Sequence, residues 1–491
     1  MPTRSRTLLA GFMWTYGVQL ATVVAQLAYA ATTSRLADSV DFGAYGVALS
    51  ASALIALVAT GGVAQGMGRL ARTDTADPAA LSVVALLFGG VGAIVLFVTA
   101  PWWAALWGAS EAVTATRVMA ISVLTAPLAG AFTGLLRRLG RFRRAALTAL
   151  VANLTGMAVG VATVMAAPSA AALVVSAVVA SALTALGTGF AVRTHLRQRP
   201  TLSIMRSHLT YSRNMIGMRL LSYGSGNVGR WTVSNVLGVG ALGQWNRADA
   251  LTSVPLQQLQ TSTTSVIYPE FRHASESPER ARHTWTDLLS LLAWVWLPLA
   301  GIAAAATPLL IPVLFGPGWE AAAQLAPAVV VATSIQALTS TLSSAHESLG
   351  KFTWLRLTLS GSLLVNCLGA VGVWISNQWW PIMVALVLAT VTQHGIGVML
   401  SSRHGYLQGA PLARNYTLAT SVGALIFLSA WGPVRLMGLD TKPFAGLLIV
   451  AAVTLVWGAL AWLNRARLVP LTLAKKYGAL SPGAVPEGDT P

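Results

Sequence analysis

The residues best suited to chemistry lie on one face of an unusually polar segment, residues 211–237. Ser212, Arg219, Tyr223, Gly226 and Arg230 follow one another at spacings of 7, 4, 3 and 4, which keeps them on one side of an α-helix. Guanidinium groups bind phosphate oxygens through paired hydrogen bonds, so this face predicts an anion site contacted by Arg219 and Arg230. The alternative is that the two arginines extend toward opposite membrane surfaces.

Three other apolar segments carry polar residues at the same helical spacing. They are Thr15, Gln19, Thr22 and Gln26; Gln257, Thr261 and Thr264; and Gln336, Ser340, Ser343 and Glu347. We expect a central hydrophilic cavity lined by Gln19, Gln26, Tyr223, Asn227 and Gln336. The alternative is that these side chains join helices through hydrogen bonds worth about 0.6 kcal/mol each.

Few titratable groups occur inside the apolar segments. The candidates for coupling or gating are Asp249, Glu347 and His394. The alternatives are local ion pairs for the two acids and a packed, hydrogen-bonded ring for the histidine. Arg117 and Arg247 are expected to assist anion binding near the outer mouth. In a second reading, Arg219 pairs with Glu347 and forms a gate.

The composition requires elements that place such residues inside a membrane. The chain has 491 residues, of which 55% are apolar and 10% are charged. Soluble proteins carry about 25% charged residues, so a water-soluble enzyme is excluded. The single Cys367 allows no disulfide framework and no cysteine metal cluster. Neither a P-loop nor a dinucleotide fingerprint occurs, so no cofactor and no metal are expected.

Hydropathy and the Gly, Pro and charge punctuation predict an all-α polytopic membrane protein with fourteen spans. The spans are 8–33, 42–68, 80–101, 112–135, 145–166, 170–192, 211–237, 242–268, 286–315, 320–348, 353–375, 380–401, 415–437 and 444–464. The apolar stretch after Arg4 and Arg6 ends in Ala28-Tyr29-Ala30, so a cleaved signal peptide is the alternative there.

The basic residues predict the orientation. Of the 32 Lys and Arg, 24 fall on the side that holds both termini and 3 on the other. This asymmetry places the termini in the cytoplasm of a bacterial cell, with the chain in its cytoplasmic membrane. It also accounts for the net charge of +17 without nucleic acid.

Matching motifs indicate an internal repeat of six helices. Phe42-Gly43-Ala44-Tyr45-Gly46 corresponds to Leu242-Gly243-Gln244-Trp245-Asn246, Leu106-Trp107-Gly108 to Leu314-Phe315-Gly316, and Leu139-Gly140-Arg141-Phe142 to Leu349-Gly350-Lys351-Phe352. The repeat predicts two lobes, 1–200 and 201–405, related by a pseudo-two-fold axis along the membrane normal. Residues 406–466 add two helices, and 467–491 form a partly disordered cytoplasmic tail.

Several motifs resemble one known family, the Wzx/WzxC-like polysaccharide transporters of the MOP superfamily, whose relatives are MATE exporters and MurJ-type flippases. The motifs are Leu237-Gly238-x-x-x-Leu242-Gly243-x-Trp245-Asn246-Arg247-Ala248, Val266-Ile267-Tyr268-Pro269-Glu270-Phe271, Leu314-Phe315-Gly316-x-x-Trp319 and Asp41-Phe42-Gly43-x-Tyr45-Gly46. The family's N-x-D-R run departs here, because Gly229 replaces the acid between Asn227 and Arg230.

The resemblance implies export of a polyprenyl-diphosphate-linked oligosaccharide by alternating access of two lobes. Its expected partners are the lipid bilayer and a polysaccharide polymerase or ligase, and the chain is expected to act as a monomer. A MATE-type cation exporter is the second hypothesis. The third is a membrane polymerase or glycosyltransferase using Asp38 or Asp41, although these two acids also suit helix capping.

Overall fold

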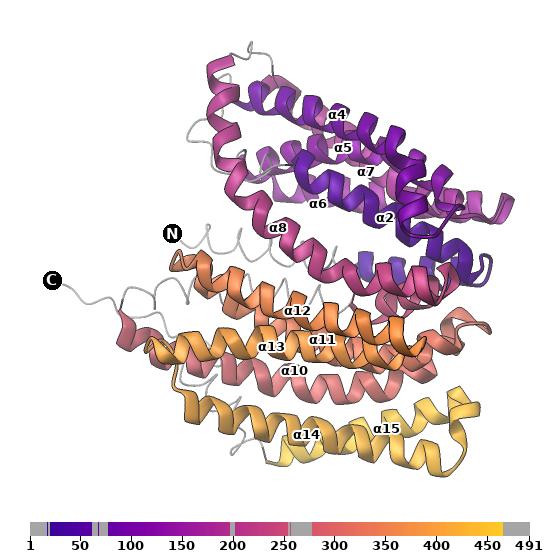
Figure 1. Cartoon of the computed structure of the whole chain (residues 1–491), viewed down its shortest axis with the longest axis vertical. Helices are drawn as coiled ribbons and strands as arrows, with labels where there is room; N and C mark the ends of the chain where they lie inside the picture. The colour runs from indigo at the N-terminus through magenta and orange to yellow at the C-terminus, as the bar shows by residue number, and fades with distance from the viewer. Residues whose placement is uncertain are drawn as a thin grey trace. The chain divides into compact units, whose positions relative to one another are not determined.

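The computed structural model describes residues 17, 20–60, 67, 77–196, 202–253, 256 and 277–464; within them it leaves out the side chains of 202–216, 218, 219 and 278. The regular elements in these ranges are all helices (Figure 1). Eleven are long and apolar enough to cross a membrane. They are α2 (Ser39–Thr60), α4 (Asp77–Leu106), α5 (Ala112–Arg138), α6 (Phe142–Ala166), α7 (Ala170–Val192), α10 (Pro278–Phe315), α11 (Glu320–Ser348), α12 (Phe352–Ser376), α13 (Trp380–Arg403), α14 (Gly409–Leu436) and α15 (Pro443–Leu463).

The predicted spans coincide with helices wherever the structure describes them. The polar segment 211–237 lies in α8 (Leu202–Val236), a helix of 35 residues that is not among the apolar eleven. The first and eighth predicted spans are described in part, as helical residues 20–34 and 239–253. The all-α polytopic class is therefore confirmed.

The helix ends repeat as the motifs do. Gly140 and Gly350 both have positive φ, 70° and 67°, and both follow the last turn of a helix. The next residue donates its backbone N–H five residues back in each case: Arg141 to Leu136 and Lys351 to His346. This is a Schellman cap, which suits glycine because it has no Cβ. The same cap thus ends α5 and α11, the fourth helices of the two predicted repeats.

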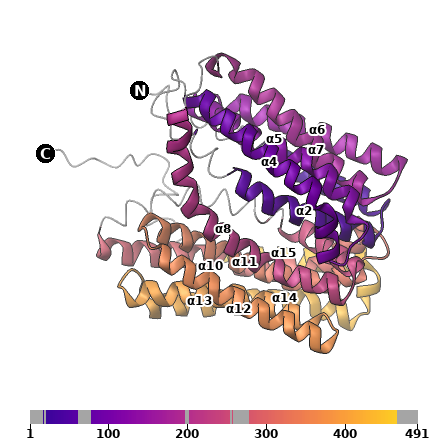
Figure 2. The ribbon, with the colours of Figure 1, turned by 45° about the horizontal axis from the view of Figure 1, so that its top comes forward.

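The chain divides into two compact units. The first comprises Met1–Ala250, Leu314–Ala322 and Cys367–Ile382. In it α4, α5, α6 and α7 lie alongside one another (Figure 2). Its main core is built on Leu96, Trp103, Trp107 and Met119.

The second unit comprises Leu251–Val313, Ala323–Asn366 and Met383–Pro491. Its main core contains Trp285, Leu289 and Trp296 of α10 with Leu338 of α11. A smaller core joins α10 to the last two helices through Leu309, Val434 and Val450.

The two units divide the chain at other places than the predicted lobe boundary after residue 200, and the lobes stay a prediction. The first unit contains α8, residues 239–250 and two short pieces of the second half. Close packing at one crossing explains why: a Cβ on Gly43 would overlap the carbonyl oxygen of Val239, and one on Gly243 would overlap that of Ser39. Gly43 and Gly243 are matched positions of the repeat, and small residues let helix backbones approach this closely.

Candidate functional site

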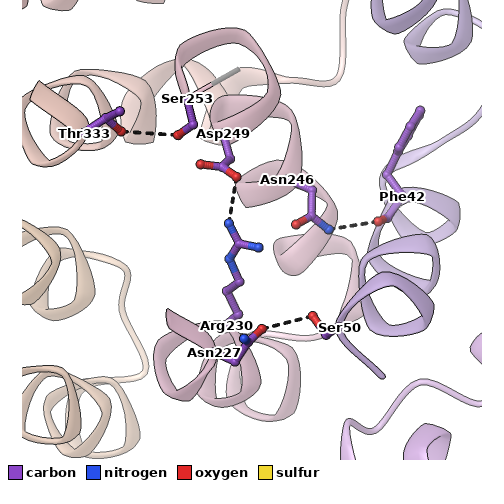
Figure 3. A network of polar contacts seen from close by, with 8 residues as sticks. All are labelled: Phe42, Ser50, Asn227, Arg230, Asn246, Asp249, Ser253 and Thr333. Carbon is purple, nitrogen blue, oxygen red and sulfur yellow. Dashed lines mark hydrogen bonds and ion pairs between the residues drawn. The ribbon is translucent and has the colours of Figure 1, made fainter. Parts of the chain in front are cut away.

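The polar face of α8 is held against α2 inside the first unit. The Tyr223 hydroxyl donates to the backbone carbonyl of Ser50 at 2.9 Å. The Ser50 hydroxyl in turn donates to Oδ1 of Asn227 at 3.0 Å (Figure 3). Tyr223 and Asn227 are one turn apart, so the helical spacing that the sequence indicated brings both onto one partner residue.

Arg230 continues this face and forms an ion pair. Its guanidinium lies 2.8 Å from Oδ2 of Asp249, with 26% and 32% of the two side chains exposed (Figure 3). Asp249 reaches Arg230 from the neighbouring helical residues 239–253, so it forms the local ion pair that was the alternative to a coupling role for this acid. An ion pair that is a quarter to a third exposed can still exchange partners.

Arg247 is sealed away from solvent. Only 6% of its surface is exposed, and its guanidinium packs 3.8 Å from the ring centroid of Phe42. It donates to the Ser34 hydroxyl at 3.2 Å, whereas its Nε is buried with no hydrogen-bond partner. A buried guanidinium with an unsatisfied donor has a high desolvation cost, so the charge of Arg247 destabilises the packed arrangement.

Arg247 belongs to a cluster that we call the seal: Ser34, Phe42, Arg247, Phe315 and Trp319. The Trp319 indole donates to the carbonyl of Ser34 at 3.1 Å, and its ring meets Phe42 edge-on at 5.5 Å. The seal joins helices of both predicted repeats within the first unit. By the predicted topology it lies at the outer ends of those helices.

A second contact of matched repeat positions adjoins the seal. The Asn246 side chain donates to the carbonyl of Phe42 at 3.1 Å (Figure 3). A Cβ on Gly46 would lie 3.0 Å from Cγ of Asn246. Gly46 pairs with Asn246 as Gly43 pairs with Gly243, at the same offset of 200 residues.

The other predicted site residues are dispersed. Oε1 of Gln26 is buried without a hydrogen-bond partner, and Gln336 on α11 is half-buried. Arg117 is exposed and lies over the ring of Phe97, with its Cζ 5.3 Å from the centroid. Gln19 and the side chain of Arg219 lie outside the described part of the chain, as do Gln257, Thr261 and Thr264.

The remaining coupling candidates lie in the second unit. Glu347 is exposed, one residue before α11 ends. The proposed pair between Glu347 and Arg219 remains a prediction, because the Arg219 side chain is not described. His394 is buried on α13, and its Nε2 lies 3.0 Å from the hydroxyl of Tyr416 on α14.

Asp38 and Asp41, the acids considered for an enzyme, cap helices. Oδ1 of Asp38 accepts the backbone N–H of Asp41 at 2.9 Å, in the first turn of α2. Oδ1 of Asp41 accepts the backbone N–H of Ala170 at 3.1 Å, at the start of α7. The contact of Asp38 is the capping that the sequence offered as the alternative, before the second span, whereas Asp41 accepts from the start of a different helix.

The environment of Gly229, where the resembled family often has an acid, is apolar. Gly229 is buried, and a Cβ there would lie 2.7 Å from Cδ1 of Ile382. A carboxylate would therefore have to enter a contact between α8 and an apolar side chain, at a high desolvation cost.

Sequence reasoning missed Ser50, Ser34 and Trp319 as partners of site residues. Isolated serines and one more tryptophan carry no periodic signal. The repeat, however, did contain a usable signal for the crossing, because matched positions of a two-fold repeat can meet at its axis. Gly43 with Gly243 and Gly46 with Asn246 are such positions.

Comparison with known proteins identifies the relatives. Residues 33–324 match the family model of a polysaccharide biosynthesis protein. The chain matches no curated protein.

Three solved structures are similar in fold. One is a lipid II flippase, MurJ, in an inward closed conformation, at 12% identity and a TM-score of 0.69, covering 93% of this chain and 99% of that one. The second is an inward-facing multidrug resistance MATE family transporter of the MOP superfamily, at 13% identity, a TM-score of 0.60 and coverage of 80% and 98%. The third, a MOP superfamily transporter from Pyrococcus furiosus, has 15% identity, a TM-score of 0.54 and coverage of 81% and 95%.

Proposed function

The chain belongs to the polysaccharide biosynthesis protein family, and from this membership we propose that it flips a polyprenyl-diphosphate-linked oligosaccharide from the cytoplasmic to the outer leaflet of a bacterial cytoplasmic membrane. It is a multi-pass membrane protein with a MurJ/MATE-like fold. The flippase among its structural neighbours acts on lipid II, and the same class of task is proposed for this chain.

One observation carries the proposal: a partly exposed arginine, Arg230, on a helix face with Tyr223 and Asn227. In this structure Arg230 binds a carboxylate oxygen of Asp249. The oxygens of a diphosphate can take the place of the carboxylate, because guanidinium groups bind carboxylates and phosphates in the same bidentate manner. The substrate would displace the carboxylate, and Asp249 would recover Arg230 when the substrate leaves.

Transport would proceed by alternating access. The seal is closed in this structure, with Arg247 buried among Ser34, Phe42 and Phe315. Release of the oligosaccharide outward would require the seal to open, while the polyprenyl tail stays in the bilayer. The termini would be cytoplasmic, and a polymerase or ligase would receive the product.

The test measures flipping directly. Proteoliposomes receive undecaprenyl diphosphate bearing a fluorescent oligosaccharide, and an impermeant quencher reports the probe on the outer face. We expect Arg230→Ala to slow flipping by about tenfold to a hundredfold, the equivalent of a lost charge-assisted bond of ~1.5–3 kcal/mol. Arg230→Lys keeps the charge but loses the paired N–H donors of the guanidinium, so its flipping rate should lie between those of the wild type and Arg230→Ala.

The chain offers a matched control. Arg435 pairs with Asp440 after α14, and its side chain is largely exposed. Arg435→Ala removes an equivalent ion pair and should leave flipping unchanged. Wild-type rates in Arg230→Ala would remove the anion site from the proposal.

Two other functions are weaker. A cation exporter would need a free carboxylate on this face, but Asp249 is held by Arg230. An enzyme would need reactive acids at Asp38 or Asp41, and both accept backbone hydrogen bonds at helix starts. Efflux of ethidium from loaded proteoliposomes would favour the exporter, and chain elongation of the oligosaccharide would favour the enzyme.

A further inference from the structure

The second unit contains a buried histidine in the middle of a helix long and apolar enough to cross a membrane. His394 on α13 is 7% exposed. Its ring stacks on Tyr416 with centroids 5.5 Å apart, and its Nε2 lies 3.0 Å from the Tyr416 hydroxyl. An ionisable side chain inside a membrane helix is costly, so it is the first place to look for function.

The second ring nitrogen of His394 has no partner. Nδ1 is buried and makes no hydrogen bond. The neutral ring accommodates this when Nε2–H donates to the tyrosine oxygen, because Nδ1 then holds only a bare lone pair. A protonated ring would bury an unsatisfied N–H and a charge, which is far less favourable. The packed structure therefore suits only the neutral form.

A second buried polar contact lies nearer the end of the same helix. Ser401 lies seven residues along α13, about 10 Å at ~1.5 Å per residue, and its hydroxyl is 2.7 Å from Nε2 of His346. Between them, a Cβ on Gly397 would lie 3.5 Å from Cε1 of His346. That is an ordinary van der Waals distance, and the tighter neighbour of Gly397 is Leu342 of α11, whose Cδ2 would lie 3.0 Å from the same Cβ.

Few charged groups face His394. Tyr416 contacts it from α14, and His346 of α11 is the other buried histidine of these helices, 1% exposed. Asp287 of α10 is half-buried, and the other charged side chains of α10 to α14 are exposed. They are Glu279, Arg280, Arg282, Glu320, Glu347, Arg356, Arg403, Arg414 and Arg435. The polarity of the site thus comes from two histidines and a phenol.

We propose that His394 is a proton-binding site linked to the conformational change: the packed unit holds it neutral, and opening of the helices around it admits water and one proton to Nδ1. The proton comes from bulk water and returns there when the helices close. This deepens the flippase proposal and rests on it, since the proton would be the coupling ion of the same transport cycle.

The size of the effect follows from the proton equilibrium. A hydrated histidine titrates near its ordinary value of about 6.5, whereas the packed form binds no proton. The ratio of open to packed molecules should then rise about tenfold between pH 7.5 and pH 5.5.

The experiment reads that ratio in the purified chain without substrate. Spin labels are placed by Phe142→Cys and Phe352→Cys in a Cys367→Ser background, because both side chains are exposed and follow the two matched glycine turns. Pulsed electron resonance in nanodiscs then gives the distance populations at both pH values. His394→Gln should abolish the shift.

Two further variants make the assignment specific. His404→Gln is the matched control, since His404 is exposed just past the end of the same helix and should leave the shift intact. Tyr416→Phe keeps the histidine but removes its Nε2 partner, so the shift should persist with a displaced midpoint. A shift lost in His346→Gln but kept in His394→Gln would overturn the assignment to His394.

A second measurement needs no variant. Exchange of the imidazole C2 hydrogen, followed by mass spectrometry of the wild-type chain, should be slower at His394 than at His404 at pH 7.5. That protection should fall as the distances shift at pH 5.5. Protection that persists at pH 5.5, or distances that do not respond to pH, would overturn the proposal. Neither readout uses the oligosaccharide, so such a failure leaves the flipping assay to decide the proposed function.

Discussion

At the scale of single residues, the Arg230–Asp249 pair determines how strongly the site can hold an anion. We expect Asp249→Asn to raise the affinity for undecaprenyl diphosphate by about tenfold, because the substrate no longer competes with a carboxylate for a bond worth ~1.5 kcal/mol or more. Native mass spectrometry of the detergent-solubilised chain measures this affinity. Asp440→Asn at the exposed pair is the control. An unchanged affinity would mean that Asp249 does not compete with the anion.

Arg247 supports a prediction of a different kind. Its charge is buried without a full set of hydrogen bonds. Opening of the seal would hydrate the guanidinium, and this hydration favours the open state. Arg247→Met packs between Phe42 and Phe315 without a buried charge. We expect the melting temperature to stay level or rise. Flipping should slow by about tenfold or more, because opening of the seal loses a driving force of ~1.4 kcal/mol or more. Arg247→Ala, which leaves a cavity, should instead melt earlier. Normal flipping in Arg247→Met would show that the charge does not promote opening.

The residue scale also shows what the sequence could and could not provide. Period 3.6 placed Tyr223 and Arg230 on one face of α8, and in the structure both side chains have partners outside that helix. The partners came from other segments: Ser50 from α2 and Asp249 from residues 239–253. Helical periodicity shows which side chains of one helix share a face. It does not show which residues of other segments pack against that face, because this depends on the tertiary structure.

At the scale of elements, the crossing of α2 with residues 239–250 depends on two glycines. A Cβ on Gly43 would overlap the Val239 carbonyl, and overpacking of this kind costs about 1–3 kcal/mol. We therefore expect Gly43→Ala to open the seal and to raise the labelling rate of Ser34→Cys, in a Cys367→Ser background, by about fivefold to a hundredfold. An impermeant maleimide applied from outside measures the rate.

Gly90 provides the control for this substitution. It is also a helical glycine, on α4, and a Cβ there meets nothing within 4 Å. Gly90→Ala should leave Ser34→Cys protected. Equal protection in Gly43→Ala would mean that the helices absorb the extra methyl group without separating.

The same crossing shows how far the repeat could be read from sequence. Matched motifs gave the offset of 200 residues, and the matched caps after α5 and α11 agree with the repeat. The offset alone did not say which mates would touch. Matched positions touch only if they face the shared axis and carry small side chains. The sequence shows that Gly43 and Gly243 are small, but only the three-dimensional arrangement of the helices shows that they face each other.

At the scale of the whole molecule, orientation is the first prediction. The 24-to-3 distribution of basic residues predicts cytoplasmic termini. Alkaline phosphatase fused at the turn near Gly140 should be inactive and a green fluorescent protein there should fluoresce, with the same outcome near residues 200 and 275. A fusion after α14, near Met437, is the control that should report the opposite side. Phosphatase activity at any of the first three positions would contradict the topology.

Alternating access predicts that the outer ends of the two repeats must separate during each cycle, and Gly46 with Asn246 gives a way to hold them together. The Cβ position of residue 46 lies 3.0 Å from Cγ of Asn246. That is about the separation between a Cβ and the far sulfur in a disulfide of ordinary geometry. We expect Gly46→Cys with Asn246→Cys, in a Cys367→Ser background, to crosslink on oxidation. Flipping should then fall to the rate of empty liposomes and recover when the disulfide is reduced.

A crosslink inside one repeat separates this effect from general rigidity. Thr125 on α5 and Ser181 on α7 offer such a pair, because their hydroxyl oxygens lie 2.8 Å apart. Both helices belong to the first repeat, so Thr125→Cys with Ser181→Cys should crosslink without stopping transport. If the oxidised 46–246 pair flipped its substrate at the full rate, the outer ends would not need to part. The buried Arg247 and the glycine crossing beside it would then serve packing alone. If this contact never opens, hydration of the Arg247 guanidinium cannot favour the conformation that releases the substrate.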